Sequence, residues 1–265
     1  MNMHEFGKEH TDVIVMLHPM GVWWDIFEYV IPILEKEYHL VIPAVPGFDP
    51  DDSDSIFTSV EEIAEEISSW LMVHNCKSIK CLYGCSMGGA IVTRMLAIQK
   101  IKTDCAIMDG GITPYQLPKP LTYLIAMRDW FMFAAGKYLS LKALRSVFDP
   151  NKYTDNDLEY IKKVMNHTKY KTIWRGFYSC NNYTMPLPVP KQNCRIQYWY
   201  GEDEAKARKW DIQYIQRIFP NVELIINKGQ DHAECFTLHP EEFCTMIKCA
   251  ISENLQENPK CNSKK

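Results

Sequence analysis

A serine flanked by glycines is the most informative feature of the sequence. Ser86 lies in the segment Gly84-Cys85-Ser86-Met87-Gly88, between an apolar run and residues with the apolar spacing of a helix. This pattern predicts a sharp strand-to-helix turn that presents the serine hydroxyl as a nucleophile. Small flanking residues are needed because strand and helix crowd together there. Cys85 is expected to point into the packed strand and to take no part in the chemistry.

A nucleophilic serine needs an imidazole to accept its proton and usually a carboxylate to orient that imidazole. Two loops after apolar runs downstream contain these groups, namely 201–204 (Gly-Glu-Asp-Glu) and 229–232 (Gly-Gln-Asp-His). His232 is the expected general base. The other candidate histidines lie in helical patterns or at a helix entry: His74, His167 and His239.

Three carboxylates are candidates for the acid. Glu204 and Asp203 are neighbours in the first of these loops, and Asp109 ends an earlier strand pattern. A carboxylate at either strand end could reach the imidazole, so these residues alone leave the choice open.

The negative oxygen formed during acyl transfer needs preorganised N–H donors. One expected donor is the amide of Met87, at the start of the helix after the nucleophile. The loop Leu17-His18-Pro19-Met20-Gly21 is the expected source of the second. Pro19 has no N–H, so Met20 is the predicted donor in that loop.

Alternating strand and helix patterns predict the framework that positions these residues. The alternation favours a mostly parallel sheet covered by helices. The predicted strands are 13–17, 39–43, 79–83, 105–109, 196–200 and 222–227, and the predicted helices include 22–37, 59–73, 205–219 and one opening at Pro240.

The pattern changes between residues 112 and 190, where prolines bracket aromatic helical stretches. We interpret this region as an inserted helical cap. The predicted division is a core of residues 1–111 and 191–253, a cap of 112–190, and a flexible tail of 254–265.

Composition excludes several classes of protein. The net charge of −4 gives no reason to expect a nucleic-acid partner. There is no apolar stretch of transmembrane length and no secretory signal pattern, so we expect a cytoplasmic protein without a membrane span. The ten cysteines are scattered without a Cys-x-x-Cys pair, which favours reduced thiols. No zinc signature is present, and neither a metal nor an organic cofactor is expected.

The order of these motifs resembles the α/β-hydrolase superfamily of serine hydrolases, with a helical cap like those of esterases and proline iminopeptidases. The resemblance spans about residues 12–252 and rests on five blocks: 17–21, 45–48, 84–89, 201–204 and 229–232 followed by 239–243. It implies Glu204 as the acid, three residues beyond the glycine that ends the strand. There are three departures: His18-Pro19, where the family usually has His-Gly; Glu204, where Asp is commoner; and a short N-terminus, which predicts that the two N-terminal strands are shortened or absent.

The expected activity is hydrolysis of a carboxylic ester or related acyl bond of a small molecule through a Ser86 acyl-enzyme. Alternatives on the same triad are an N-terminal aminopeptidase and an acyltransferase, and a hydrolase-fold ligand receptor is a further one. The oligomeric state is not predicted. Cap aromatics that could line an acyl pocket are Tyr115, Tyr123, Trp130, Phe131, Phe133, Trp174, Phe177 and Tyr178.

Overall fold

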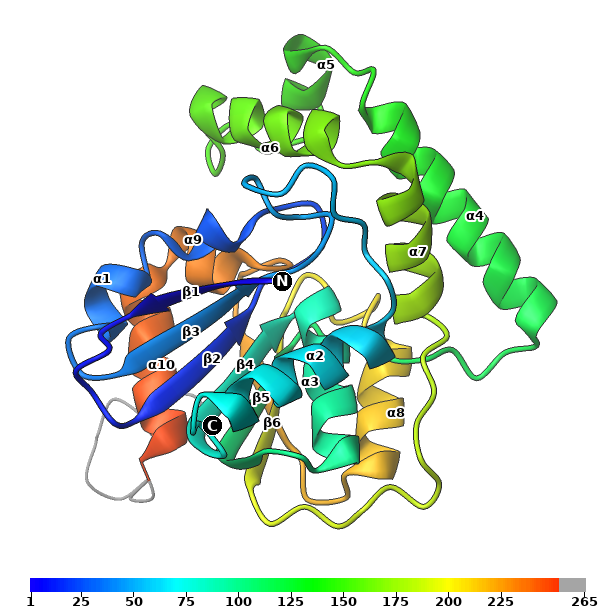
Figure 1. The fold of residues 1–265 in the computed structure, drawn as a ribbon. Coiled ribbons are helices and arrows are strands. Elements are labelled where there is room, and N and C mark those ends of the chain that lie inside the picture. The colour runs from blue at the N-terminus through cyan, green and yellow to red at the C-terminus, as the bar shows by residue number, and fades with distance from the viewer. Residues whose placement is uncertain (253–265) are drawn as a thin grey trace.

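A single seven-stranded sheet forms the centre of the part of the chain described by this computed structural model, residues 1–252 (Figure 1). The strands lie in the order β1-β3-β2-β4-β5-β6-β7, and all neighbouring pairs are parallel except β1 and β3. Their bounds are β1 Asn2–Phe6, β2 Val13–Leu17, β3 His39–Ala44, β4 Ser78–Cys85, β5 Lys102–Asp109, β6 Arg195–Gly201 and β7 Glu223–Asn227.

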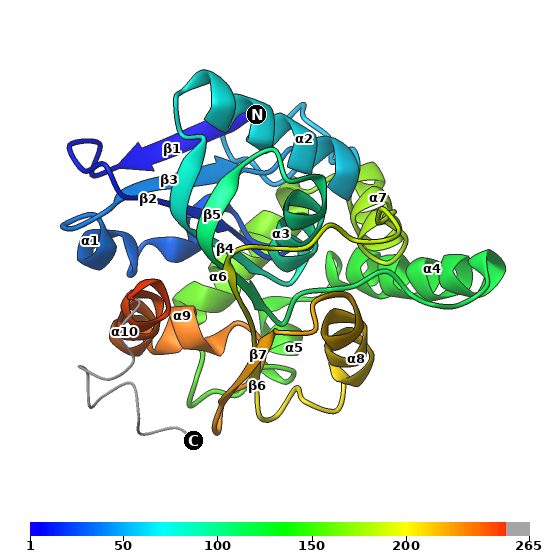
Figure 2. The same ribbon diagram turned by 90° about the horizontal axis from the view of Figure 1, so that it is seen from below.

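Helices cover both faces of this sheet, as the alternating pattern predicts. On one face, α2 (Val60–Val73), α3 (Met87–Ile98) and α8 (Lys209–Ile218) enclose one buried apolar cluster. On the other, α1 (Ile31–Leu34), α9 (Glu234–Leu238) and α10 (Pro240–Ile251) enclose a second (Figure 2). Because apolar side chains are needed on both faces, every residue of the central strand β2 is buried.

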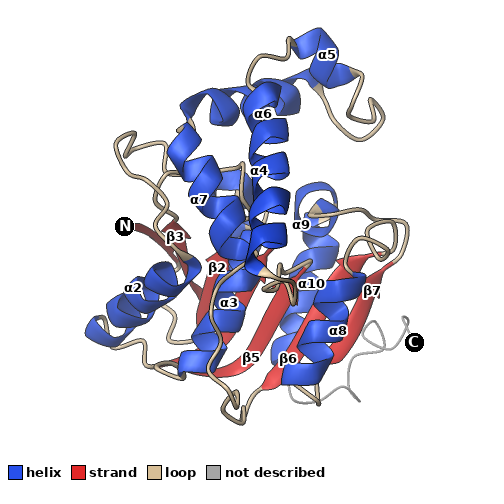
Figure 3. Cartoon of the chain, turned by 90° about the vertical axis from the view of Figure 1, so that its right-hand side faces the viewer, coloured by secondary structure: helices blue, strands red, loops and turns tan. Residues whose placement is uncertain are grey.

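Four further helices lie beyond the carboxyl ends of the strands (Figure 3). They are α4 (Lys119–Gly136), α5 (Leu141–Arg145), α6 (Asp155–His167) and α7 (Tyr170–Cys180). Hydrogen bonds join α7 to the sheet domain: the Val60 N–H donates to Ser179 Oγ, and the Phe57 N–H donates to Thr172 Oγ1. The segment 112–190 is helical as expected, while its standing as a separate cap stays a prediction.

The N-terminal segment contains a strand that is not among the predicted ones. It forms the edge strand β1, which pairs antiparallel with β3 and is the one strand that precedes β2. Gly7 turns the chain back after β1 with φ +62°, and a Cβ there would lie 2.4 Å from the Tyr38 carbonyl oxygen. The strand is only partly buried, which explains why its sequence is too polar to predict a strand.

The predicted helix 22–37 is also wrong in extent. The chain forms a short 3₁₀ helix, η1 (Trp24–Phe27), and the single turn of α1 instead. Neither element has a side-chain N-cap hydrogen bond, and Pro32 lacks the N–H that would extend a helix through it.

Most cysteines bear out the prediction of reduced thiols. Cys249, a half-buried residue of α10, is the exception because it is disulfide-bonded. The free thiols are Cys76, Cys81, Cys85, Cys105, Cys180, Cys194, Cys235 and Cys244.

None of the helices between residues 1 and 252 combines the length and apolarity needed to cross a membrane. The predicted flexible tail of 254–265 lies outside the described residues.

Candidate active site

Ser86 occupies a strained turn between β4 and α3. Its backbone has φ 53° and ψ −111°, a conformation that a residue with a side chain rarely adopts. The turn is held by the main chain: the Ser86 N–H donates to the Asp109 carbonyl oxygen at 2.8 Å, and the Ile112 N–H donates to the Ser86 carbonyl oxygen at 3.2 Å. These bonds tie the turn to the end of β5.

The glycines on both sides of Ser86 allow the close approach that the turn requires. A Cβ on Gly84 would lie 2.3 Å from the Gly88 carbonyl oxygen, and one on Gly88 would lie 2.3 Å from the Leu17 carbonyl oxygen. Local sterics therefore explain why small residues surround the serine.

Cys85 faces the interior, as predicted. It is fully buried at the end of β4, and burial raises the pKa of its thiol well above the usual value, with the Asp109 and Glu204 carboxylates acting in the same direction. A thiolate, the reactive form of cysteine, is therefore disfavoured.

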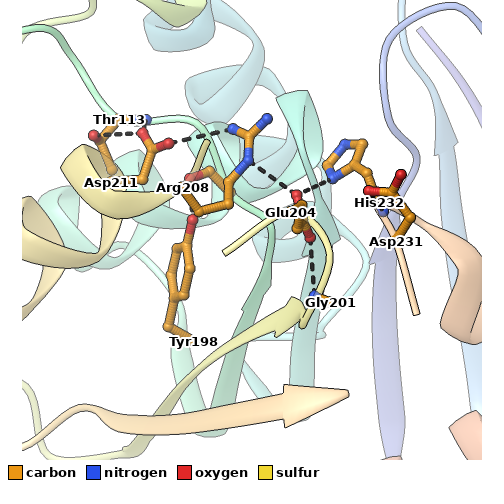
Figure 4. Close-up of polar contacts among 9 residues, drawn as sticks. Thr113, Tyr198, Gly201, Glu204, Arg208, Asp211, Asp231 and His232 are labelled. Carbon is orange, nitrogen blue, oxygen red and sulfur yellow. Dashed lines mark hydrogen bonds and ion pairs between the residues drawn. The ribbon is translucent and has the colours of Figure 1, made fainter. Parts of the chain in front are cut away.

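His232 and Glu204 form a hydrogen-bonded pair in the loops after β7 and β6 (Figure 4). Nδ1 of His232 lies 2.7 Å from Oε2 of Glu204. The side chain of Glu204 is buried, whereas Asp203 is exposed and its N–H donates to the Gln230 carbonyl oxygen. Of the two adjacent carboxylates, Glu204 is the one brought to the imidazole.

Asp109, the third candidate acid, has a different partner. Its carboxylate accepts a hydrogen bond from the Tyr83 hydroxyl at 2.7 Å. Burial raises the pKa of Asp109 to about 6, although the Tyr83 hydrogen bond opposes the shift. Asp109 thus lies near the site at the end of β5 without a hydrogen bond to His232 among the described residues.

Arg208 and Asp211 extend the polar network behind Glu204 (Figure 4). Nε of Arg208 donates to Oε2 of Glu204 at 3.0 Å, and Nη1 of Arg208 donates to Asp211 at 3.2 Å. Asp211 in turn accepts from both the N–H and the hydroxyl of Thr113. Arg208 is not among the residues predicted from the sequence; the available signal was its position four residues after Glu204, the spacing of an i,i+4 ion pair.

Several donors converge on Glu204. Burial acts to raise the pKa of this carboxyl, but the hydrogen bond and charge of His232, the charge of Arg208 and the Gly201 N–H outweigh it and lower the pKa. Glu204 is therefore ionised at neutral pH, the form that can hold an imidazolium.

The end of β5 contacts both the Ser86 turn, through the Asp109 carbonyl oxygen, and the His232 ring, beside Gly110. Gly110 follows Asp109, and a Cβ on it would lie 2.7 Å from the His232 ring. Among the described residues no hydrogen bond joins the Ser86 hydroxyl to His232. In structures without substrate, such bonds are often long and tighten only in the complex.

The loop after β2 is held by a buried histidine. Nδ1 of His18 donates to the Pro19 carbonyl oxygen at 2.8 Å, and Nε2 accepts from the Val45 N–H at 3.3 Å. Burial lowers the pKa of His18 to about 4, so the ring is neutral and serves to fix the loop. The sulfur of Met20 lies against Gly176 of α7. A Cβ added to Gly176 would be 2.8 Å from this sulfur.

A cavity of about 370 Å³ reaches His232 from the side of η1, α6 and α9. Its apolar and aromatic walls include Val22, Ile26, Phe148, Tyr153, Tyr160, Ile161, Phe236 and Leu238. Three carboxylates, Asp25, Glu28 and Asp157, also border it. This volume is within the range of small-molecule sites.

The aromatic side chains of α4 lie on different sides of the helix. Phe133 of α4 lies over the loop after β2. A Cβ added to Gly21 of that loop would be 3.2 Å from the Phe133 ring. Phe131 and Tyr123, in contrast, are exposed, and neither borders the cavity that reaches His232.

A protein-family model described as the alpha/beta hydrolase family matches residues 14–245. The chain belongs to this family. The fold class predicted from the motifs is therefore confirmed, and no curated protein gives a significant match to the sequence.

Solved structures of other alpha/beta hydrolases share the fold. A putative alpha/beta hydrolase from Desulfitobacterium hafniense has a TM-score of 0.73 at 20% identity, covering 95% of this chain and 100% of its own. A structure from a study of carboxylesterases of Nitrososphaera gargenis has a TM-score of 0.69 at 19% identity, with coverages of 93% and 92%. A thermophilic esterase from Thermogutta terrifontis has a TM-score of 0.70 at 14% identity, and the match covers 93% of this chain and 91% of the esterase chain. At these identities the likeness concerns the fold alone.

Proposed function

We propose that this alpha/beta hydrolase is a serine carboxylesterase acting on small acyl substrates. The observation that carries the proposal is the strained Ser86 turn beside the His232–Glu204 pair. This set of groups provides a nucleophile, a base and an acid that orients the base. The esterases among the structural neighbours agree with it.

In this mechanism Ser86 attacks the ester carbonyl while His232 takes the hydroxyl proton. The imidazolium, stabilised by ionised Glu204, then protonates the leaving alcohol, and water attacks the acyl-enzyme with His232 again as base. Met87 lies in the first turn of α3, where N–H groups have no helical acceptor, so its amide is available for the oxyanion. Met20 is the proposed second donor. Residues 112–190 would act as the cap that encloses the acyl group.

A fluorophosphonate probe tests the proposal directly, because it reacts with an activated serine. Purified protein is expected to be labelled and Ser86→Ala to remain unlabelled, while Cys85→Ala is labelled like the original. Absence of labelling, or labelling that survives Ser86→Ala, would contradict the proposal. A series of p-nitrophenyl esters then gives the preferred acyl length.

An N-terminal aminopeptidase is the second candidate, favoured by the carboxylates that border the cavity next to His232. Asp25, Glu28 and Asp157 would attract a free α-ammonium group. Aminoacyl anilides tested beside the esters separate the two activities: faster turnover of anilides with a free amine than of their acetylated forms would favour the peptidase.

A further inference from the structure

The outward side of α4 is apolar where a surface helix normally carries charges. Phe131 and Met132 are 66% and 65% exposed. We call the exposed residues at helical spacing along this side the α4 face. It consists of Pro120, Leu121, Leu124, Met127, Arg128, Phe131, Met132 and Ala135. Arg128 is the only charged residue among these eight.

The opposite side of α4 already supplies the packing that holds the helix in place. Thr122, Ala126 and Ala134 are buried there, and Phe133 lies against the loop at Gly21. Figure 1 shows α4 on the outside of the molecule with α7 on its inner side. Within residues 1–252, packing therefore gives no reason for the outward residues to be apolar.

The charge of this region is opposite to that of the whole protein. Residues 112–148 contain five basic side chains and one acidic, a net charge of +4, in a chain with a net charge of −4. Lys119 and Lys142 are exposed near the two ends of α4. Arg128 lies on the α4 face itself, where it is paired with the neighbouring Asp129. Tyr138, just beyond the helix, is 81% exposed.

We propose that the α4 face docks this protein on an anionic lipid surface. Apolar side chains with Lys and Arg around them are the composition of helices that lie in the bilayer interface, and tyrosine rings favour the same depth. A symmetric dimer through this face is disfavoured because it would bring the basic side chains of both copies together. Docking is independent of the proposed esterase activity.

Vesicle sedimentation tests the docking, with phosphatidylcholine vesicles that contain or lack phosphatidylglycerol. The protein is expected to bind the anionic vesicles, and Phe131→Glu to bind at least about tenfold more weakly, since it puts a charge into the interface. The matched control is Val73→Glu at the end of α2, where a 77% exposed apolar residue lies on another part of the surface. It should bind like the unmodified protein.

A second variant separates the electrostatic contribution. Arg128→Gln with Lys142→Gln should weaken binding to anionic vesicles by about fivefold per charge removed and leave the weak binding to neutral vesicles unchanged. Equal binding by Phe131→Glu and Val73→Glu would overturn the proposal. So would a protein that ignores vesicles but forms a concentration-dependent dimer that Phe131→Glu dissociates.

The polar network behind Glu204 carries a second inference, which rests on the proposed function. Oε2 of Glu204 accepts from both Nδ1 of His232 and Nε of Arg208. We propose that Arg208 is a positioning residue that shares this carboxylate with His232 and so limits how strongly Glu204 stabilises the imidazolium. The charged groups facing the pair from neighbouring elements are Asp109, Arg208, Asp211 and Asp231.

The direction of a pH shift distinguishes this role from a purely structural one. With Arg208→Gln, Glu204 keeps its full charge for His232, so the imidazolium should persist to higher pH. The acid limb of kcat/KM should move the same way. Arg208→Lys, which retains the charge, should leave the titration nearly unchanged even if the rate falls.

NMR titration of His232, assigned by comparison with His232→Asn, measures this shift without any need for activity. A titration in Arg208→Gln that stays unchanged or moves to lower pH would overturn the role of Arg208. Failure of the esterase proposal is recognised separately, by an unlabelled Ser86.

Discussion

Gly110 offers a sharp test of how closely the site is packed. Its φ is +53°, and a Cβ would lie 2.7 Å from the His232 ring and 3.1 Å from Oε1 of Glu204. Ordinary contact begins at 3.4 Å, so Gly110→Ala must displace the ring by about 0.7 Å. Misplacement by about 1 Å can reduce a rate 10²-fold, so we expect kcat/KM to fall by about 10- to 100-fold.

Gly229→Ala is the matched control for this change. Gly229 also has a positive φ, +66°, but nothing lies within 4 Å of an added Cβ. Both variants should lose about 1–2 kcal/mol of stability from the backbone conformation, and only Gly110→Ala should lose activity. The measurements are urea unfolding and the rate of fluorophosphonate labelling or ester turnover. Equal activity in the two variants would refute the reasoning about the His232 ring.

Three further predictions concern the groups around the nucleophile. Glu204→Gln should lower kcat by about 10³- to 10⁴-fold, as loss of a triad carboxylate does, whereas Asp109→Asn should lower it by less than about tenfold; the reverse order in ester turnover would make Asp109 the acid. Burial holds the pKa of Asp109 at about 6, above its unfolded value of 3.8, so its contribution to stability falls as pH rises between these values. The unfolding free energy of Asp109→Asn relative to the original protein should therefore rise by about 2 kcal/mol from pH 4 to pH 7, and a constant difference in denaturant unfolding would count against this. His18 has the opposite effect on the pH dependence of stability. Its pKa of about 4 in the folded protein lies below the unfolded value of 6.5, so this group increases the unfolding free energy as pH rises from 4 to 6.5. His18→Asn should lack this increase.

The acid illustrates a choice that the motifs alone left open. Glu202, Asp203 and Glu204 are adjacent in the sequence, and only the family resemblance favoured Glu204. In the folded chain, Asp203 is exposed while Glu204 turns inward to His232. The outcome depends on how the loops after β6 and β7 pack together, which no local pattern specifies.

The region between residues 112 and 190 shows a similar limit. The sequence predicts helices between residues 112 and 190, but α4 is apolar on nearly all sides, so periodicity does not reveal which side faces the core. Packing against α7 and the loop at Gly21 decides that Phe133 faces inward and Phe131 outward.

The sequence by itself determined the nucleophile turn, the strand-helix alternation and the expected base, because these depend on local sterics, on hydrophobic periodicity and on the order of motifs along the chain. Only the tertiary structure decided the partner of His232, the bridge from Arg208 to Glu204 and the direction of each side of α4. These features arise from contacts between segments far apart in the chain, such as the 28 residues that separate Glu204 from His232. Such contacts become fixed only when the ends of the parallel strands meet at one edge of the sheet.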